Sequence, residues 1–545
     1  MRKFLFLIVG TLVTGILVAG GLVTNTNQSV LFTRLQSRNA STRIDAVYYN
    51  PAGLGRLGSG FYASVNNQTI NQTNSILNNY TYLTSTPKEY VGKVNTIIFP
   101  DVYIAFKIGK LAFSTGFNPI GGGGGVTYDD GLPSYEMEVS DLVPYTYDSG
   151  FETSGYSADI FFSNSSRYYG YHANVTYSIN DIISVAAGIR LVTAKNKYYG
   201  YVRNISINPD YTAFGEQYNG NMVLASDFFS SGAIKFNTLS SDATLYKTVL
   251  QDIINNGGGA ILLNNTDALE PYGLDLTEIT NIQKIINSAE VSQNGLTIQN
   301  AQLILADAAP FFNTKATSMT DYAEQTQDKE VDAVETGMGF SPMISVNVSP
   351  NEMLNIALKY EFKTNLELTT KLFDNKGGGI FTEGAKRVAD MPAMLATGIE
   401  LWPMDKIMIT GSINYFFDKG VDYDGSDTSD INMIKKNSKE IALGGEFEIN
   451  NILRVSGGWV GTLSGVNKDY QNEQRFSLKA HSFGGGFGVK LTSMLDLNIG
   501  GQYTIYKEGT KSFDHMLDTD LIDVTETYNK NTWIVAIGLD LYLGM

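Results

Sequence analysis

The C-terminal stretch 532–545 reads TWIVAIGLDLYLGM and alternates apolar residues with small or polar ones. Successive side chains of a β-strand point to opposite faces, so this stretch forms a strand with one apolar face. The residues on the apolar face are Trp533, Val535, Ile537, Leu539, Leu541 and Leu543. One such strand also occurs in ordinary half-buried sheets, so its meaning depends on how often the pattern returns.

The same alternation returns at 183–191, 354–363, 440–449 and 495–505. Charged residues such as Lys359, Glu446 and Asp496 fall on the second face of these strands. A charge that faced lipid would be costly, so the second face must look into an enclosed interior. The repeated pattern therefore predicts a closed barrel with lipid outside and a polar interior.

Short and long connections alternate along the chain, which sets the number of strands. Tight turn signals occur near 109–110, 180–181, 349–351, 403–405, 450–451 and 492–493. Long polar stretches lie near 69–100, 119–167, 200–335, 369–390, 419–437, 461–476 and 508–530. Short periplasmic turns and long outer loops are typical of bacterial barrels. We predict an all-β membrane protein, a 14-stranded antiparallel transmembrane β-barrel over 60–545, in the outer membrane of a Gram-negative cell.

Composition excludes several other classes. The chain has 545 residues, of which 17% are charged, and a net charge of −16. A mean hydropathy of −0.09 excludes a helical multi-span protein but not a barrel, whose strands average out. The acidic balance argues against a nucleic-acid partner. The absence of Cys from the sequence excludes a disulfide framework, a thiol nucleophile and a cysteine metal site.

The N-terminus has the features of an export signal. Met1-Arg2-Lys3 precedes an apolar run, and the small residues Ala19-Gly20 follow it. This order predicts a signal peptide over 1–20, with an uncleaved anchor helix as the alternative.

Residues 21–59 do not alternate and carry a local excess of positive charge. Arg34, Arg38, Arg43 and Arg56 face a single acid, Asp45, within an otherwise acidic chain. A small basic insert in an acidic container indicates a hatch, an N-terminal segment lodged inside the barrel.

The hatch arginines have two possible roles. An arginine fork suits a carboxylate, so Arg34, Arg38 or Arg43 is a candidate for binding the carboxylate head group of a ligand. The alternative is structural, with the arginines paired to wall acids such as Glu446 and Glu448.

The third strand contains a local irregularity. Phe117-Asn118-Pro119 is followed by glycines at 121–125. Proline cannot donate to a strand ladder and glycines favour kinks and bulges, so pairing with a neighbouring strand should fail here. The alternative is a loop that begins just beyond the strand.

The longest loop, 204–333, has helical periodicity. Leu245, Val249 and Ile253 recur every four residues, and Asn256-Gly257 follows as a helix stop. Two further helices are predicted from two sets of apolar residues, Ile279, Ile282 and Ile286, then Ile298 and Leu305. We predict an extracellular loop with packed helical segments, or alternatively a separate soluble domain carried on the loop.

With these features the chain resembles the FadL/TodX family of outer-membrane transporters for hydrophobic compounds. The resemblance covers the hatch with Asn50-Pro51-Ala52, the glycine-rich third strand, the helical third loop and the fourteen strands. One departure is the C-terminus, Gly544-Met545, where such barrels commonly end in an aromatic residue.

The resemblance implies a monomeric barrel in contact with outer-membrane lipids, whose hatch blocks a water pathway. Its cargo would be fatty acids or aromatic hydrocarbons, with long-chain fatty acids favoured, and it would leave sideways through the third-strand kink. The candidate ligand and gating residues are Asn50, Pro51, Ala52, Arg34, Arg38, Arg43, Phe117, Asn118, Pro119 and Gly121.

We therefore predict a passive transporter that is not an enzyme and uses no cofactor or metal. A general diffusion porin for polar solutes is the main alternative, and an outer-membrane lipase built around His481 is a weaker one. The sequence contains only three His and no nucleophile elbow, P-loop or HExxH motif. The acidic stretch 422–430 resembles a calcium loop but lacks the spacing of an EF-hand.

Overall fold

The computed structural model describes residues 24–376, 381–421 and 433–544. The predicted signal peptide, residues 1–20, lies outside the described residues. The acidic stretch 422–430, considered as a calcium loop, also lies outside them.

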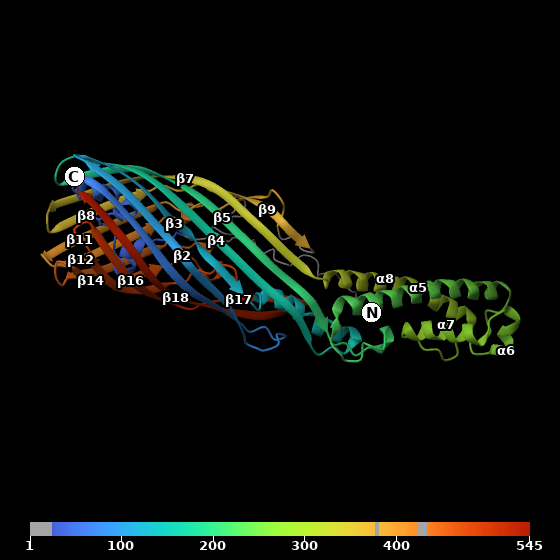
Figure 1. Cartoon of the computed structure of the whole chain (residues 1–545). Coiled ribbons are helices and arrows are strands. Elements are labelled where there is room, and N and C mark those ends of the chain that lie inside the picture. The colour runs from blue at the N-terminus through green and yellow to red at the C-terminus, as the bar shows by residue number, and fades with distance from the viewer. Residues whose placement is uncertain (1–23, 377–380, 422–432, 545) are drawn as a thin grey trace. The chain divides into compact units, whose positions relative to one another are not determined.

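Fourteen antiparallel strands form the wall of a closed barrel, which confirms the predicted fold class (Figure 1). The first strand pairs along its whole length with the last, from Gly60↔Gly544 to Asn78↔Glu526, and this pairing closes the sheet. Two wall strands are interrupted and carry two labels each, because β9 continues β8, and β10 precedes β11. The wall consists of β1 (Gly60–Asn78), β2 (Lys88–Ile108), β3 (Leu111–Tyr128), β4 (Tyr156–Ser178), β5 (Ile183–Ile207), β7 (Lys329–Asn351), β8 (Leu354–Glu361) with β9 (Glu367–Lys376), β10 (Lys386–Val388) with β11 (Met394–Met404), β12 (Ile407–Phe416), β13 (Lys439–Glu448), β14 (Leu453–Leu463), β15 (Ala480–Lys490), β16 (Leu495–Tyr506) and β18 (Asp520–Gly544).

The two faces of the wall differ as the alternation predicts. In β18, Trp533 is 46% exposed and Val535 is 52% exposed, whereas Ala536 and Asp540 are each 1% exposed. An outward apolar face and an inward face that buries a carboxylate require lipid outside and a polar interior. The barrel therefore spans a membrane.

Backbone pairing extends further than the sequence indicated. β1 runs to Asn78 and β2 begins at Lys88, although a loop was predicted over 69–100. The long loop predicted over 204–333 is likewise shorter at both ends, because β5 ends at Ile207 and β7 begins at Lys329. The predicted boundaries followed the loss of apolar alternation, but pairing continues where polar residues occupy both faces of a strand.

Shorter elements lie between the wall strands. β17 (Gly509–Leu517) forms a hairpin with β18, and β6 (Val223–Leu224) pairs with the end of β5. The helical turns in these connections are α3 (Pro133–Ser140), η5 (Asp418–Gly420) and η6 (Lys468–Tyr470).

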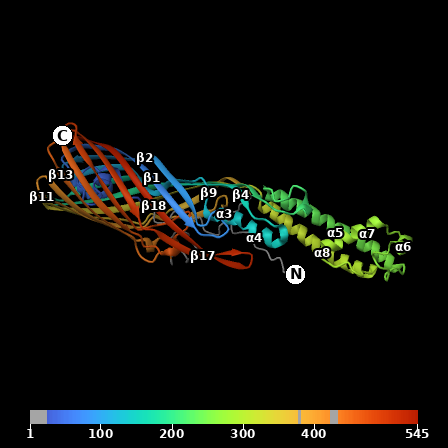
Figure 2. The same ribbon diagram turned by 90° about the horizontal axis from the view of Figure 1, so that it is seen from below.

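The hatch fills part of the barrel interior (Figure 2, dark blue). It contains α1 (Ser29–Arg34), α2 (Ala46–Tyr49) and η1 (Pro51–Arg56). Its apolar residues share one core with the wall, where Val47 of the hatch packs among buried wall residues that include Tyr103 and Ala442. β1 begins at Gly60, directly after the hatch.

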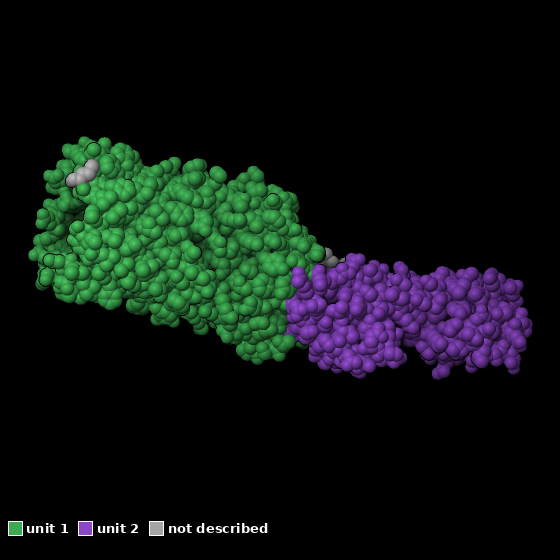
Figure 3. All heavy atoms as spheres, viewed as in Figure 1, with its two compact units in different colours: residues 1–137, 160–202, 329–545 green, residues 138–159, 203–328 purple. Residues whose placement is uncertain are grey.

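Residues 138–159 and 203–328 form a second compact unit (Figure 3, purple). Its helices are α4 (Leu142–Thr146), η2 (Tyr147–Phe151), η3 (Thr212–Phe214), α5 (Ala225–Asn255), α6 (Thr266–Leu269), η4 (Glu270–Tyr272), α7 (Leu276–Ser288) and α8 (Ile298–Gln325). In the described part of the chain, none of the helices is long and apolar enough to cross a membrane.

The second unit has a hydrophobic core of its own, as the alternative of a separate domain envisages. Ile282, Ile286 and Leu305 lie in this core, on the helices predicted for them. Leu245 does not, since it is 58% exposed. The error arose because α5 is a full 31-residue helix, and the four-residue spacing of a short segment drifts off its buried face.

Candidate functional site

β3 parts from β2 over the predicted kink. The two strands pair up to Val94↔Val126 and again from Val102↔Phe117, with a register break between. Within the described barrel, residues 118–125 of β3 and residues 95–101 of β2 therefore form no backbone ladder pairs with each other. We call this the strand gap.

The sequence of the kink explains the gap. Gly122 and Gly124 have φ of +92° and +75°, which side chains rarely adopt. A Cβ on Gly122 would also lie 2.2 Å from the Ser166 carbonyl oxygen of β4. Pro119 contributes no N–H to either neighbour. β3 nevertheless continues to Tyr128, so the kink lies within a strand and not at the start of a loop.

Residues 24–28 of the hatch, here called the edge segment, lie along the strand gap. Thr24 forms an antiparallel bridge with Gly121. The Asn25 N–H donates to the Ile120 carbonyl at 2.8 Å, and Asn25 Nδ2 donates to the Gly122 carbonyl at 3.2 Å. Gln28 Nε2 donates to the Pro119 carbonyl at 3.0 Å. The hatch thus supplies hydrogen-bond partners that β2 does not.

Asp101 connects the two sides of the strand gap with the hatch. Its Oδ1 accepts from Asn118 Nδ2 at 2.6 Å across the gap. Its Oδ2 accepts from the Ser29 N–H at 3.1 Å, at the start of α1. One buried carboxylate therefore bonds to β3 and to the hatch at once.

Three of the four hatch arginines, Arg34, Arg38 and Arg43, are engaged in buried ion pairs, whereas the exposed Arg56 donates to the Asp181 carbonyl. Arg34 lies 2.7 Å from Glu446 of the wall, and Arg43 contacts the other oxygen of the same carboxylate. Arg38 makes two bonds to Asp45, at 2.7 and 2.9 Å, within the hatch itself. This is the structural arrangement that the sequence left as the alternative, with Glu446 as the wall acid and with Asp45 in one pair.

Lys359 and Arg190 of the wall hold the hatch at Tyr48 of α2. The Lys359 Nζ lies 4.8 Å from the Tyr48 ring centroid and donates to the Tyr48 carbonyl at 2.7 Å. The Arg190 guanidinium lies 5.3 Å from the same ring. Tyr48 is therefore fixed by two cations.

The Asn50-Pro51-Ala52 turn is bonded to three wall strands. Asn50 Nδ2 donates to Asn347 Oδ1 of β7 at 2.7 Å. Thr176 of β4 donates to the Pro51 carbonyl and Ser184 of β5 to the Ala52 carbonyl, each at 2.7 Å. The turn forms the firmly held base of the hatch, and its predicted role in gating stays a prediction.

Tyr49 joins this held part to the edge segment. Its hydroxyl accepts from the Gln28 N–H at 2.9 Å and lies 2.7 Å from the Thr26 carbonyl. Burial raises the pKa of Tyr49 well above its usual value, so the hydroxyl keeps its proton.

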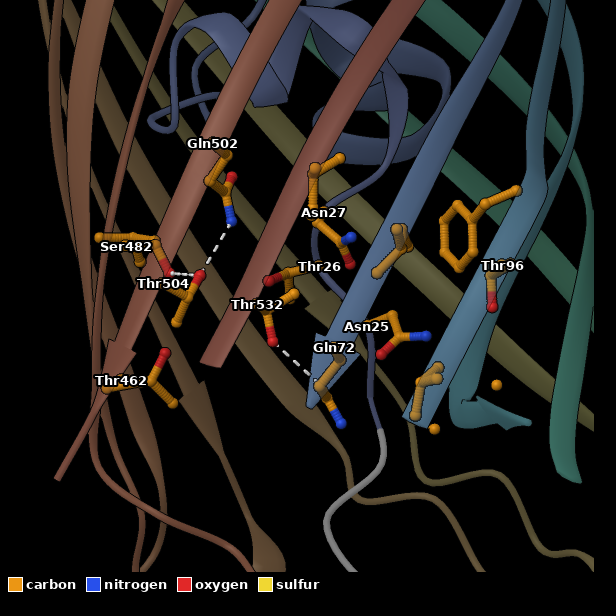
Figure 4. A pocket seen from close by; sticks show the side chains of 18 of the residues that line it. Asn25, Thr26, Asn27, Gln72, Thr96, Thr462, Ser482, Gln502, Thr504 and Thr532 are labelled. Atoms are coloured by element: carbon orange, nitrogen blue, oxygen red, sulfur yellow. Dashed lines mark hydrogen bonds between the residues drawn. The ribbon is translucent and has the colours of Figure 1, made fainter. Parts of the chain in front are cut away.

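A cavity of about 270 Å³ lies beside the edge segment and the kink (Figure 4). β1, β2, β13, β14, β15, β16 and β18 contribute its other walls. Its polar residues include Asn25, Thr26, Asn27, Gln72, Thr96, Thr462, Ser482, Gln502, Thr504 and Thr532. Its apolar residues are Phe32, Ile70, Val94, Phe99, Val460, Leu478, Ala480 and Ile534.

The structure brings together only some of the predicted site residues. Pro119 and Gly121 meet the edge segment and Asn118 bonds to Asp101, whereas the Phe117 ring packs against Tyr169 and Tyr171 with centroids 5.4 and 5.2 Å away. The sequence reasoning missed Asn25, Gln28 and Asp101, which carry no periodic signal. Glu440 and Gln502 fall on the inward face of the alternating stretches 440–449 and 495–505, but the pattern did not assign them to a cavity.

Among the residues that the structure describes, no serine hydrogen-bonds to His481, the residue of the lipase alternative. Its Nδ1 accepts from Trp459 Nε1 at 3.3 Å. Ser482, the next residue in β15, is buried on the cavity side, whereas His481 is on the exposed side. The histidine and the serine thus face opposite sides of the wall.

These features define an outer-membrane β-barrel whose interior holds its own N-terminal segment. No protein-family model matches the chain, and no curated protein sequence matches it. Solved structures do. A FadL homologue from Pseudomonas aeruginosa has 10% identity and a TM-score of 0.56, with 96% of this chain and 99% of that one covered.

Two toluene transporters are also similar. TodX from P. putida has 11% identity and a TM-score of 0.49, over 93% of this chain and 95% of that one. TbuX from Ralstonia pickettii has 12% identity and a TM-score of 0.44, over 92% and 94%. The structural similarity to the FadL homologue shows that the chain has the fold of the FadL/TodX barrels.

Proposed function

We propose that this protein is a passive transporter that takes up hydrophobic compounds across the outer membrane. The observation that carries the proposal is the strand gap, an opening in the hydrogen-bonded wall that the protein's own edge segment covers from inside. The cavity touches both the edge segment and Gly122, Gly123 and Gly124 of the kink. Only the edge segment thus separates a compound in the cavity from the strand gap.

In the proposed path, cargo displaces the edge segment and leaves through the strand gap into the bilayer. Three hydrogen bonds hold this segment to the kink. At about 1 kcal/mol net each, their loss costs roughly 3 kcal/mol, and the bonds of the segment to Glu440, Gln68 and Tyr49 add to this cost, which stays within the range of local opening events.

Release of the whole hatch would be far more costly. Removing Arg34 and Arg43 from Glu446 leaves buried charges unpaired, at roughly 3–5 kcal/mol for each broken pair. The edge segment is therefore the moving part of our proposal, and the rest of the hatch stays in place and keeps out water and ions.

The cargo class is a further part of the proposal. The family resemblance favours long-chain fatty acids, with aromatic hydrocarbons as the other class. Arg34, Arg38 and Arg43 already have carboxylate partners in Glu446 and Asp45, although Arg34 uses only Nη1, and its buried Nε and Nη2 have no hydrogen-bond partner among the described residues.

A reversible lock tests the path. The chain has no Cys, so Thr24→Cys with Gly121→Cys introduces the only thiols, at a bridged pair whose spacing suits a disulfide. We expect oxidised cells to lose accumulation of radiolabelled toluene and palmitate, and a reductant to restore it. The matched control is Ala63→Cys with Leu541→Cys, a paired position in the static wall.

Uptake that continues through the oxidised lock would overturn the path at the strand gap. Single-channel recording in planar bilayers tests the porin alternative. Negligible current through the wild type is expected, whereas a large steady ionic current would leave a general diffusion porin.

A further inference from the structure

The cavity beside the edge segment carries negative and hydrogen-bond-accepting character. Glu440 is the one residue with a formal charge among those that line it, and none of these described residues is Lys, Arg or His. The Glu440 Oε2 accepts from Thr26 Oγ1 at 2.9 Å and from Asn414 Nδ2 at 3.0 Å. A carboxylate has about four acceptor positions, so Glu440 has room for a further donor.

Gln502 adds a second acceptor from another strand. Its Oε1 is buried and has no hydrogen-bond partner among the described residues. The neighbouring hydroxyls satisfy one another, with Ser482 Oγ and Thr504 Oγ1 2.7 Å apart, and Thr532 Oγ1 donating to Gln72 at 3.0 Å (Figure 4). A buried acceptor without a donor costs free energy, and a ligand that donates to it removes that cost.

The remaining surface and the volume limit the size and kind of ligand. Phe32, Ile70, Phe99 and Ile534 give the cavity an apolar side. A dry cavity of about 150 Å³ holds one benzene molecule, so the about 270 Å³ here fits one substituted ring better than an extended long chain.

We propose that this cavity binds a small, uncharged aromatic compound with a hydroxyl group, which donates to Glu440 while its ring packs on the apolar side. This inference rests on the proposed transport function and deepens it, because it names the substrate class. An aromatic carboxylate is repelled by Glu440 and finds no cation in the cavity. A bare hydrocarbon leaves the acceptors unsatisfied.

Three probes that differ at one position separate these classes: 4-ethylphenol, ethylbenzene and 4-ethylbenzoate. At pH 7 the phenol keeps its proton and the benzoate has lost it. We expect isothermal titration calorimetry of the purified full-length barrel in amphipol to give a Kd for 4-ethylphenol at least about tenfold lower than for the other two. Equal or tighter binding of ethylbenzene or 4-ethylbenzoate would overturn the inference and leave the proposed function standing. Binding of none of the three, together with no uptake of toluene or palmitate, would overturn both.

Substitutions assign the contact to the two acceptors. Glu440→Gln keeps an acceptor for Thr26 and removes the charge, so 4-ethylphenol should weaken about tenfold and 4-ethylbenzoate should gain affinity. Gln502→Leu should weaken 4-ethylphenol about threefold and improve ethylbenzene. Glu526→Gln, at another buried acid that does not line the cavity, is the matched control and should change none of the affinities. Unchanged affinities in Glu440→Gln would overturn the role of this carboxylate.

Discussion

The edge segment and the rest of the hatch belong to one short stretch of chain, yet they are held in different ways. Residues 24–28 are held by hydrogen bonds and by no ion pair among the described residues: three go to backbone carbonyls of an irregular strand, and others join them to side chains such as Glu440, Gln68 and Tyr49. Residues 29–56, here called the anchored hatch, are held by buried ion pairs to Glu446 and by Lys359 and Arg190 around Tyr48. The difference indicates that a plug need not open as one body. The weakly held edge segment can permit passage while the firmly held anchored hatch keeps the barrel sealed.

The largest effect is expected from removing the anchor. Glu446→Ala leaves Arg34 and Arg43 buried without their carboxylate, which should lower the free energy of unfolding by roughly 3–5 kcal/mol. Release of the anchored hatch should also let ions pass, so the variant should conduct ions in planar bilayers. Urea unfolding and single-channel recording check these two results.

The control for this variant is Glu448→Ala. Glu448 is two residues along the same strand and makes no ion pair among the described residues. A Glu446→Ala barrel that stayed as stable and as closed as the Glu448→Ala barrel would contradict the division of the hatch into two regions.

A smaller effect is expected at the joint between the two regions. Tyr49→Phe removes the hydroxyl that contacts Gln28 and Thr26, at a cost of about 1–2 kcal/mol. The edge segment should open more often, so initial uptake of a radiolabelled hydrocarbon should rise roughly tenfold without ion conductance. Tyr62→Phe, whose hydroxyl bonds to the Gly58 carbonyl, is the control. Conductance in Tyr49→Phe would mean that the two regions move together.

The smallest effect is expected within the edge segment itself. Gln28→Ala removes the bond to the Pro119 carbonyl, worth about 1 kcal/mol, together with a bond to the Asn25 carbonyl within the edge segment. Initial uptake should rise about fivefold, and the unfolding midpoint should stay unchanged. Gln36→Ala, which removes a bond to the Thr33 carbonyl within the anchored hatch, should leave uptake unchanged. Equal uptake in the two variants would argue against a gate at residues 24–28.

Local chemistry made the barrel and the kink predictable. The period of two in β18 assigns each side chain to a face before the barrel is closed, and Pro119 with its glycines disrupts pairing through its own backbone. Glu446 could be named as a partner for the arginines because a charge on the inward face of a barrel needs a counter-charge.

The remaining features depend on contacts between distant residues. Asn25 and Gly122 are 97 positions apart, and TNTNQ in the edge segment has no hydrophobic pattern. Glu440 and Gln502 were predictable as inward residues, but barrel closure and the position of Thr26 decide which inward residues surround a cavity. Strand ends were misjudged because backbone hydrogen bonds continue after the apolar alternation stops.

The second compact unit has a consequence for how the barrel assembles. Its longer segment, 203–328, is inserted between the paired strands β5 and β7, and the two ends of this segment meet where the Asn204 N–H donates to Asp328 Oδ1 at 2.9 Å. Closing a flexible loop of roughly 125 residues costs on the order of 4 kcal/mol of chain entropy. A unit that folds on its own core bears that cost before strand pairing begins. The neighbouring ends of β5 and β7 are then delivered to each other as if a short turn joined them.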